Sequence, residues 1–324
     1  MALRRATSRL SRDLNGLLAP RAIVPAALQD AAPIVDDRGP ASGLGGVRFG
    51  SQDAVKQRMK SVQNIQKITK AMKMVAASKM RSAQTATEKS RGMVKPLVRM
   101  LGDMPAAAAD KNLTMPISTD KGLCGGINST VSKYARVLHR MNQADGKDSS
   151  VIVIGEKAKL QLARDFPENI QMTFADLGKV KITFSQISQV ADDILKTDFD
   201  AARIIFNRFV NSISFKPTIA TILAPDSLER NLDSGDLDAY EIEGPDRSEL
   251  LLDLCEFQLA ATLYNAVQEN NCSEHASRMM AMENSTKNAA EMLGQLTLMY
   301  NRTRQASITR ELIEIISGAS ALEG

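Results

Sequence analysis

Two long stretches without helix-breaking residues constrain this chain more than any other feature. No proline or glycine interrupts residues 53–91, and residues 246–317 contain no proline and a single glycine, Gly294. At 1.5 Å per residue these stretches correspond to helices of about 58 and 105 Å. Helices of that length predict a coiled coil or stalk, so we expect the two ends of the mature chain to pair with each other.

The first stretch carries a narrow apolar stripe. Its members recur at steps of three and four, which is typical of an amphipathic helix. Pro96 and Pro105 are expected to kink or end this helix. The stripe consists of Val55, Met59, Val62, Ile65, Ile68, Met72, Val75, Met80 and Ala83.

The second stretch has a seam that changes along its length. It begins with large apolar residues from Leu254 to Tyr264 and turns polar and small through Gln268, Asn271 and His275. Apolar residues return from Met282 onward. The sequence therefore predicts a weakly packed seam over residues 271–286, softened by methionines.

The region between the helices has a different pattern. Short apolar runs alternate with helical segments, which predicts a small doubly wound, Rossmann-like α/β domain inserted between the terminal helices. Strands are expected at 113–118, 151–154, 171–174, 202–210 and 218–223. The predicted organisation is a leader at 1–50, a first helix at 51–109, the α/β domain at 110–224, an acidic surface loop at 225–245 and a final helix at 246–324.

Residues 1–50 have the composition of a targeting segment. Between residues 4 and 21, five arginines lie among alanine, leucine and serine, with Asp13 the one acid. Arg-rich, acid-poor and amphipathic leaders are typical of mitochondrial transit peptides. A disordered tail that stays attached is the alternative.

Candidate chemistry is sparse. The cysteines Cys124, Cys255 and Cys272 form no CxxC pair, and the histidines His139 and His275 are far apart in sequence, so we expect no metal, no cofactor and no catalytic residue. The Gly-rich stretch at 119–126 follows a predicted strand, where a phosphate loop would lie. Its spacing matches neither common nucleotide motif. A nucleotide-binding α/β enzyme remains the alternative function.

The first helix is strongly polarised. Eight basic residues between positions 53 and 82 face one acid, Asp53, which predicts an acidic partner surface. Nucleic acid would also suit this charge, but the segment has no aromatic residue to stack on bases. A basic coiled-coil scaffold is the second alternative. The basic residues are Lys56, Arg58, Lys60, Lys67, Lys70, Lys73, Lys79 and Arg81.

Three separated motifs resemble one family. The run from Lys67 to Lys79 (KITKAMKMVAASK), the run DKGLCGGIN from Asp120, and the C-terminal runs SEHA from Ser273 and YNRTRQASIT from Tyr300 are similar to the gamma subunit of F-type ATP synthases. The resemblance spans about residues 51–321. It implies a rotating central shaft whose terminal helices form an antiparallel coiled coil, with the active sites on partner subunits.

The resemblance also implies partners and a location. The shaft would lie inside a ring of alpha and beta subunits, with the α/β domain as a foot on the membrane c-ring beside the small delta and epsilon stalk subunits. Neither nucleic acid nor a transmembrane segment is expected, since no apolar run reaches about 18 residues. Plastid members carry a regulatory cysteine pair that this chain lacks, so the matrix side of the mitochondrial inner membrane is favoured over the chloroplast.

The resemblance assigns roles to particular residues. Matched positions predict rotor–stator coupling contacts at Met72, Lys73, Arg278, Arg304, Gln305, Thr309 and Glu311. A basic face toward the beta subunits comprises Lys67, Lys70, Lys79 and Arg81, and an apolar bearing tip comprises Ile308, Leu312, Ile315 and Ile316. Tyr240 and Glu241 are the predicted foot-to-ring contact.

Overall fold

The computed structural model describes residues 52–101, 109–178, 181–224, 227–228 and 247–323. The predicted leader at 1–50 lies outside these residues, as do residues 229–245 of the predicted acidic loop. Along the chain, one long helix precedes a domain with a five-stranded sheet and a second long helix follows it. The elements after the first helix are β1 (Lys111–Pro116), α3 (Ile127–Ala144), β2 (Asp148–Ile154), α4 (Glu156–Leu162), η2 (Pro167–Asn169), β3 (Ile170–Phe174), α5 (Phe184–Leu195), β4 (Ala201–Phe209) and β5 (Phe215–Leu223).

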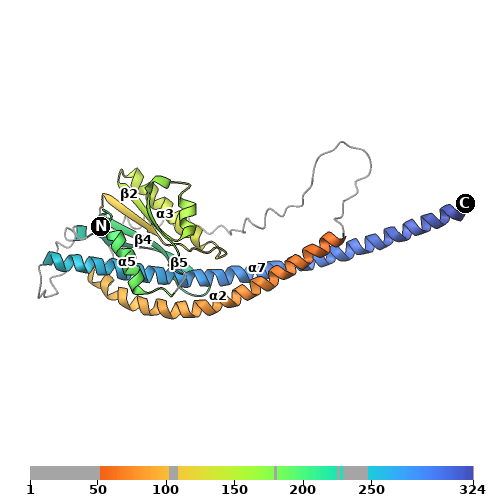
Figure 1. Ribbon diagram of the computed structural model, residues 1–324, viewed down its shortest axis with the longest axis horizontal. Coiled ribbons are helices and arrows are strands. Elements are labelled where there is room, and N and C mark those ends of the chain that lie inside the picture. The colour runs from red at the N-terminus through yellow and green to blue at the C-terminus, as the bar shows by residue number, and fades with distance from the viewer. Residues whose placement is uncertain (1–51, 102–108, 179–180, 225–226, 229–246, 324) are drawn as a thin grey trace, which may run out of the picture. The chain divides into compact units, whose positions relative to one another are not determined.

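The terminal helices pair along most of the first one. Helix α2 runs over Gln52–Leu101 and α7 over Arg247–Glu323, and the two lie side by side (Figure 1). Val62 packs with Ala289, Met80 with Cys272 and Leu97 with Ala261, so positions rise on one helix as they fall on the other. We call this antiparallel pair the shaft. It confirms the coiled coil predicted from the two proline-free stretches.

The structure adds two details to the predicted first helix. The helix continues through Pro96 to Leu101, because Val94 and Leu97 on either side of the proline pack against α7. Ile65, Ile68 and Val75 do not belong to the seam, since each is more than half exposed. The seam instead passes through the small residues Thr69 and Ala76, where Thr69 contacts the Thr286 hydroxyl at 2.8 Å.

The sheet has the strand order β3-β2-β1-β4-β5. Its first four strands are parallel, as a doubly wound domain requires, and the chain reverses direction across the sheet between β1 and β4. Strand β5 pairs antiparallel with β4 as a hairpin, so the sheet is mixed. The predicted doubly wound, Rossmann-like plan is confirmed, and the structure adds an antiparallel edge strand whose direction the sequence does not indicate.

Helices cover both faces of the sheet. Helices α3 and α4 pack on one face around Val131, Val151 and Ile205, while α5 packs on the other around Ile187 and Ile204. The second face is completed by α7, whose Leu259 and Leu263 are almost fully buried there. One helix therefore belongs both to the shaft and to the core of the inserted domain.

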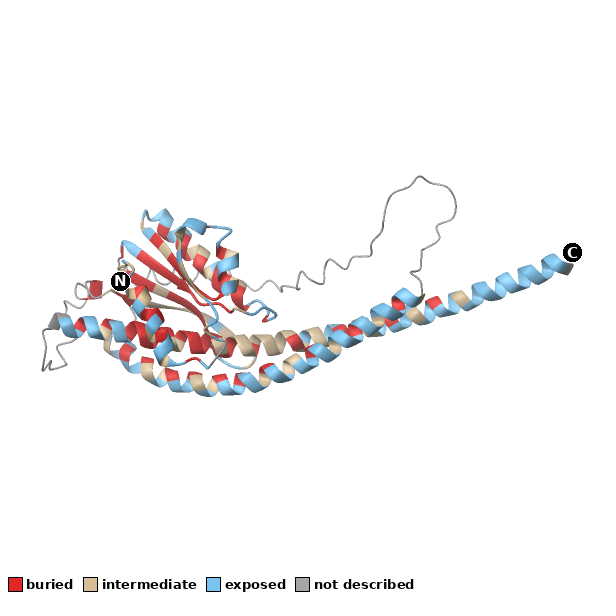
Figure 2. Ribbon diagram, viewed as in Figure 1, coloured by how far each residue is buried: buried red, intermediate tan, exposed pale blue. Residues whose placement is uncertain are grey.

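The burial of α7 changes along its length. Beside the sheet it is mostly buried, whereas its C-terminal end is almost wholly exposed (Figure 2). Gln52, at the start of α2, donates to the Tyr300 hydroxyl at 3.2 Å, and Thr303 is the last buried residue of α7. Among the described residues, this helix is also long and apolar enough from Glu249 to Leu322 to span a membrane, judged by length and composition alone. Of its most apolar window, 56% is buried inside the protein, which is the behaviour of a core helix.

Substitution of Gly155 tests the packing between the end of β1 and the start of α4. Its φ is +96°, and an added Cβ would lie 2.6 Å from Ser118 Oγ and 2.8 Å from the Ser118 backbone. Gly155→Ala should lower the free energy of unfolding by about 2 kcal/mol or more, because both strain and overlap oppose it. Gly92→Ala is the control, since no atom lies within 4 Å of its Cβ position. Equal stability of the two variants in chemical denaturation would contradict this packing.

Candidate functional site

Helix α7 fills the crevice at the carboxyl ends of the parallel strands. Ligands of open α/β sheets bind at this place. Here the Asn270 amide donates to the Ser118 carbonyl at 3.3 Å and accepts from the Asn207 amide at 3.0 Å. Ser273 Oγ donates to the Asn207 carbonyl at 2.8 Å. The cavity left between Ser118, Gly155 and Asn270 has about 40 Å³, far below the several hundred that small-molecule sites need.

The Gly-rich loop at 119–126 packs against the same helix. Ser277 Oγ donates to the Cys124 carbonyl at 2.5 Å, and Arg278 reaches the Gly122 carbonyl at 3.4 Å. Gly125 has φ +64°, and a Cβ there would lie 3.1 Å from Ser277 Oγ. The loop therefore uses its glycine for a left-handed turn in close contact with a helix, and it presents carbonyls to that helix.

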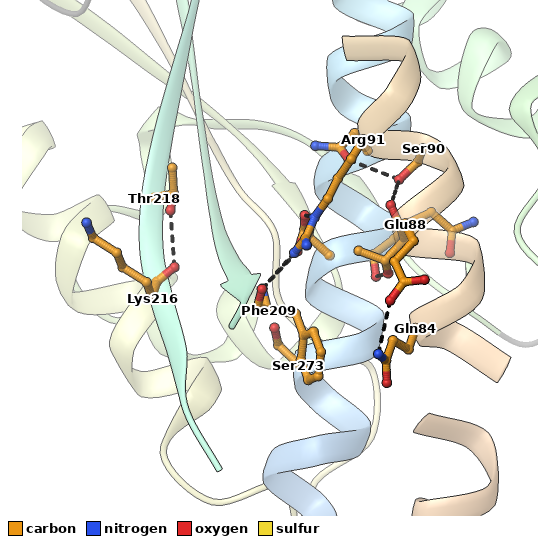
Figure 3. A network of polar contacts seen from close by, with 12 residues as sticks. Gln84, Glu88, Ser90, Arg91, Phe209, Lys216, Thr218 and Ser273 are labelled. Carbon is orange, nitrogen blue, oxygen red and sulfur yellow. Dashed lines mark hydrogen bonds and ion pairs between the residues drawn. The ribbon is translucent and has the colours of Figure 1, made fainter. Parts of the chain in front are cut away.

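A buried ion pair ties three elements together. Arg91 on α2 donates from Nε to Glu269 Oε1 at 2.5 Å and from Nη2 to Glu269 Oε2 at 2.9 Å. The same Nη2 donates to the Phe209 carbonyl at 2.7 Å, and the Phe209 N–H donates to Glu269 Oε2 at 2.8 Å. Figure 3 shows Arg91 extending toward Phe209 on β4. The hydrogen bond to Glu269 raises the pKa of Arg91, so the guanidinium keeps its charge.

Together these side chains form a polar joint between the shaft and the inserted domain. Each bonds to a backbone or side-chain group of that domain, and four of the six are buried. The sequence predicted a weakly packed seam over residues 271–286, but Cys272 and Ser273 at its start are fully buried. The joint consists of Gln268, Glu269, Asn270, Ser273, Ser277 and Arg278.

The electrostatics beside the joint are dominated by burial. Arg278 Nη2 donates to Glu274 Oε1 at 2.5 Å, and burial raises the pKa of Glu274 despite this cation. Burial and the neighbouring cations Arg278, Lys79 and Lys121 lower the pKa of His275 to about 4, so it is neutral at pH 7. Burial also raises the pKa of Cys255 and Cys272 to about 11, which makes both thiols poor nucleophiles.

The predicted coupling residues near the joint lie on two faces of the shaft. Met72 and Lys79 line a cleft of about 350 Å³ with His275 and Arg278. Lys73 lies on the seam side, where its Nζ is 3.2 Å from Glu283 Oε2. Of the predicted basic face, Lys67, Lys70 and Arg81 are exposed at helical spacing on one side, so Lys79 does not share their face.

The other predicted residues lie near the free end of α7. Arg304, Gln305, Thr309 and Glu311 are exposed. Two side-chain hydrogen bonds involve them, and both stay within the helix: Thr309 Oγ1 donates to the Gln305 carbonyl at 2.9 Å, and Ser307 Oγ donates to Glu311 Oε1 at 3.3 Å. The predicted bearing tip is also exposed, by 45% at Ile308 and by 54–67% at Leu312, Ile315 and Ile316. Tyr240 and Glu241 lie outside the described residues.

Sequence reasoning missed Arg91, Glu269, Asn270 and Asn207. The sequence signal that could have indicated Glu269 and Asn270 was a cluster of polar residues within a helix so long that part of it had to be covered by other elements. Nothing in the sequence alone indicated that these side chains face the sheet. Among the described residues, no group of three histidines, cysteines or carboxylates is arranged to hold a metal ion.

Comparisons with known proteins agree with this arrangement of helices and sheet. A family model described as ATP synthase matches residues 51–322. The chain is 56% identical over 288 residues to "ATP synthase subunit gamma, mitochondrial" of Ipomoea batatas, covering 87% of this chain and 88% of that protein. It is 51% identical to the protein of the same name in Arabidopsis thaliana, covering 90% and 94%.

Solved structures share the fold. A chain of the Euglena gracilis mitochondrial ATP synthase OSCP/F1/c-ring structure superposes with a TM-score of 0.73 at 22% identity, covering 84% of this chain and 95% of that one. A chain from the Tetrahymena thermophila mitochondrial ATP synthase central stalk/c-ring structure gives 0.56 at 28% identity, covering 67% and 98%. The fold therefore defines the class of protein: a helical shaft that carries an α/β domain. The chain belongs to the ATP synthase gamma-subunit family.

The ion pair of the joint can be tested by removing one partner. Arg91→Met should lower the free energy of unfolding by about 3 kcal/mol, because it leaves the buried Glu269 carboxylate without its cation and with only the Phe209 N–H as a donor. Adding Glu269→Gln should recover part of the loss. Lys196→Met, which breaks the exposed pair with Asp193, should leave stability unchanged in the same denaturation assay. No loss in Arg91→Met would show that the pair is not buried as described.

His275 predicts a pH dependence. Its pKa is about 4 in the folded chain and near 6.5 when unfolded, so between these values the unfolded chain binds a proton that the folded chain does not. Stability should therefore fall as pH drops from 6.5 to 4, by on the order of 1 kcal/mol from this group after solvent screening. His275→Gln should remove that part of the fall. Identical pH profiles for the two proteins would contradict the burial of His275, since Glu274 titrates in both.

Proposed function

We propose that this chain is the rotating central-shaft subunit of a mitochondrial ATP synthase and couples proton-driven rotation of a membrane ring to ATP synthesis on partner subunits. The observation that carries the proposal is the joint. A long helical pair built into the core of an α/β domain by a buried ion pair is suited to passing torque from the domain to the helices. Family membership over residues 51–322 supports the same role.

The proposed mechanism separates where torque enters from where it acts. Torque enters at the α/β domain, crosses the joint into α7 and α2, and reaches the exposed end of α7. A compact, close-packed core transmits such a load because it deforms little. The shaft is asymmetric around its axis, so its rotation would impose different conformations on the surrounding sites in turn.

We propose the alpha and beta subunits as partners around the shaft, and the c-ring with the small delta and epsilon subunits around the α/β domain. The titles of similar structures name F1, rotor and c-ring assemblies, which supports this set. Tyr240 and Glu241 are proposed to contact the ring. The basic face of α2 would meet an acidic beta-subunit surface through screened contacts, whose shallow energy suits a sliding part.

The subunit is proposed to be non-catalytic. The crevice that would hold a nucleotide is filled by Asn270 and Ser273, which argues against the alternative of a nucleotide-binding enzyme. Stoichiometric binding of ATP to the isolated chain in equilibrium dialysis would revive that alternative. Salt-dependent binding of duplex DNA that protects α2 would favour a basic scaffold instead.

The names of the relatives support a mitochondrial location, and we propose the matrix side of the inner membrane. The proposal as a whole is tested by purifying the ATPase head and its stalk from the native membrane and probing with antibody to this chain. The chain should be present at one copy per three beta subunits, as expected for a single central shaft. Its absence from the active complex would contradict the proposed function.

The predicted contact at the free end of α7 is tested by Arg304→Ala with Gln305→Ala. Loss of one or two hydrogen bonds to a beta subunit should lower turnover or proton pumping of the assembled enzyme about threefold to tenfold. The chain should keep its stability, since both side chains are exposed. Arg310→Ala is the matched control on the same helix. Unchanged hydrolysis and pumping would count against the assigned contact.

Met72→Lys tests the proposed contact on α2. The substitution adds a charge beside Lys73 at the rim of the cleft and should reduce pumping per ATP hydrolysed more than it reduces assembly. Met72→Leu, which keeps size and polarity, should behave like the native protein. Equal coupling ratios in all three proteins would exclude Met72 as a coupling residue.

A further inference from the structure

A groove beside the joint, lined in part by Arg91 and Glu269, has no binding role in the function proposed above. It has a volume of about 490 Å³ and lies between the C-terminal half of α2 and the hairpin of β4 and β5, with α7 as its floor. That volume is within the range of small-molecule sites. Strand β5 is an edge of the sheet, so the groove opens at that edge.

The interior of the groove combines apolar walls with polar side chains on its floor. Val94, Phe206 and Ile222 provide buried apolar walls. Gln258 and Thr262 on the floor are 7% and 6% exposed, and neither side chain has a hydrogen-bond partner among the described residues. Because both side chains line the groove, their polar groups are available to water or to a ligand there.

The rim of the groove is cationic. Lys95 and Arg99 lie one turn apart on α2, and Arg208 lies on β4. No carboxylate of the described part of the chain forms an ion pair with any of the three. The one acid that lines the groove, Glu269, is already neutralised by Arg91. The groove therefore presents three uncompensated positive charges around an apolar interior.

We propose that this groove binds a single-chain amphipathic anion, such as a long-chain carboxylate. The aliphatic chain would cover Val94, Val98, Phe206 and Ile222 in place of water, which is favourable in proportion to the apolar area buried. The acidic head would lie among Lys95, Arg99 and Arg208, with Gln258 or Thr262 available to a polar group inside. A neutral chain of the same length lacks the attraction of the rim, and a cation is repelled by it.

The test uses the full chain and 13C-carboxyl dodecanoate below its micelle concentration, followed by NMR and equilibrium dialysis. We expect saturable binding of one molecule per chain. Dodecanol should bind more weakly and dodecyltrimethylammonium should not bind. The triple variant Lys95→Gln, Arg99→Gln, Arg208→Gln should bind dodecanoate roughly tenfold more weakly, since three screened charge contacts are lost. Lys89→Gln, a cation of α2 outside the groove, should bind normally.

Several results would overturn the proposal. These are no saturable binding, binding that the triple variant leaves unchanged, and equal binding of the cationic amphiphile. A second arm repeats the titration on the assembled ATPase complex. Binding that persists there supports the proposal, whereas loss on assembly would show that a segment of a partner subunit occupies the groove. Rotor function does not enter either readout, so failure here leaves the proposed function untouched.

Discussion

The structure depends on the compensation of one buried carboxylate. Glu269 is almost fully inaccessible, and it is held by a two-pronged contact from Arg91 and by the N–H of Phe209. A buried ion pair is weak evidence for stability in itself, but an unpaired one is strongly destabilising. The three elements that supply these groups can therefore separate only at a large cost. This interaction fixes α2, α7 and β4 in one register, and the remaining polar contacts of the joint follow from that register.

A related constraint acts on α7. Its early half completes the hydrophobic core of the sheet through Leu259 and Leu263, while the same turns pack against α2. A helix shared by two packing units cannot tilt relative to one without disturbing the other. Beyond Thr303 that constraint ends, and the helix continues with exposed apolar residues at its free end. One element thus changes from a rigid core helix to an exposed end suited to contact with other subunits.

Much of this plan was predictable from the sequence. The lack of proline and glycine predicts the two terminal helices, and the alternation of short apolar runs with helical segments predicts the parallel strands. The antiparallel pairing of β5 was missed because an apolar run carries no strand direction. The exposure of Ile65, Ile68 and Val75 could not be predicted because periodicity alone cannot say which apolar residues of the stripe face the partner helix. The joint was missed because polar residues on a long helix are usually solvated, and only the position of the sheet shows that these are buried.

The central claim is that the inserted domain and the shaft turn as one body. It can be tested with a fluorescent bead on the exposed position of α3 in Lys133→Cys, which should label selectively because the three native cysteines are buried. The assembled ATPase head would be immobilised through its beta subunits and supplied with ATP. The account predicts unidirectional rotation of the bead in step with hydrolysis. A bead that stays still, or turns freely in both directions while ATP is hydrolysed, would contradict it.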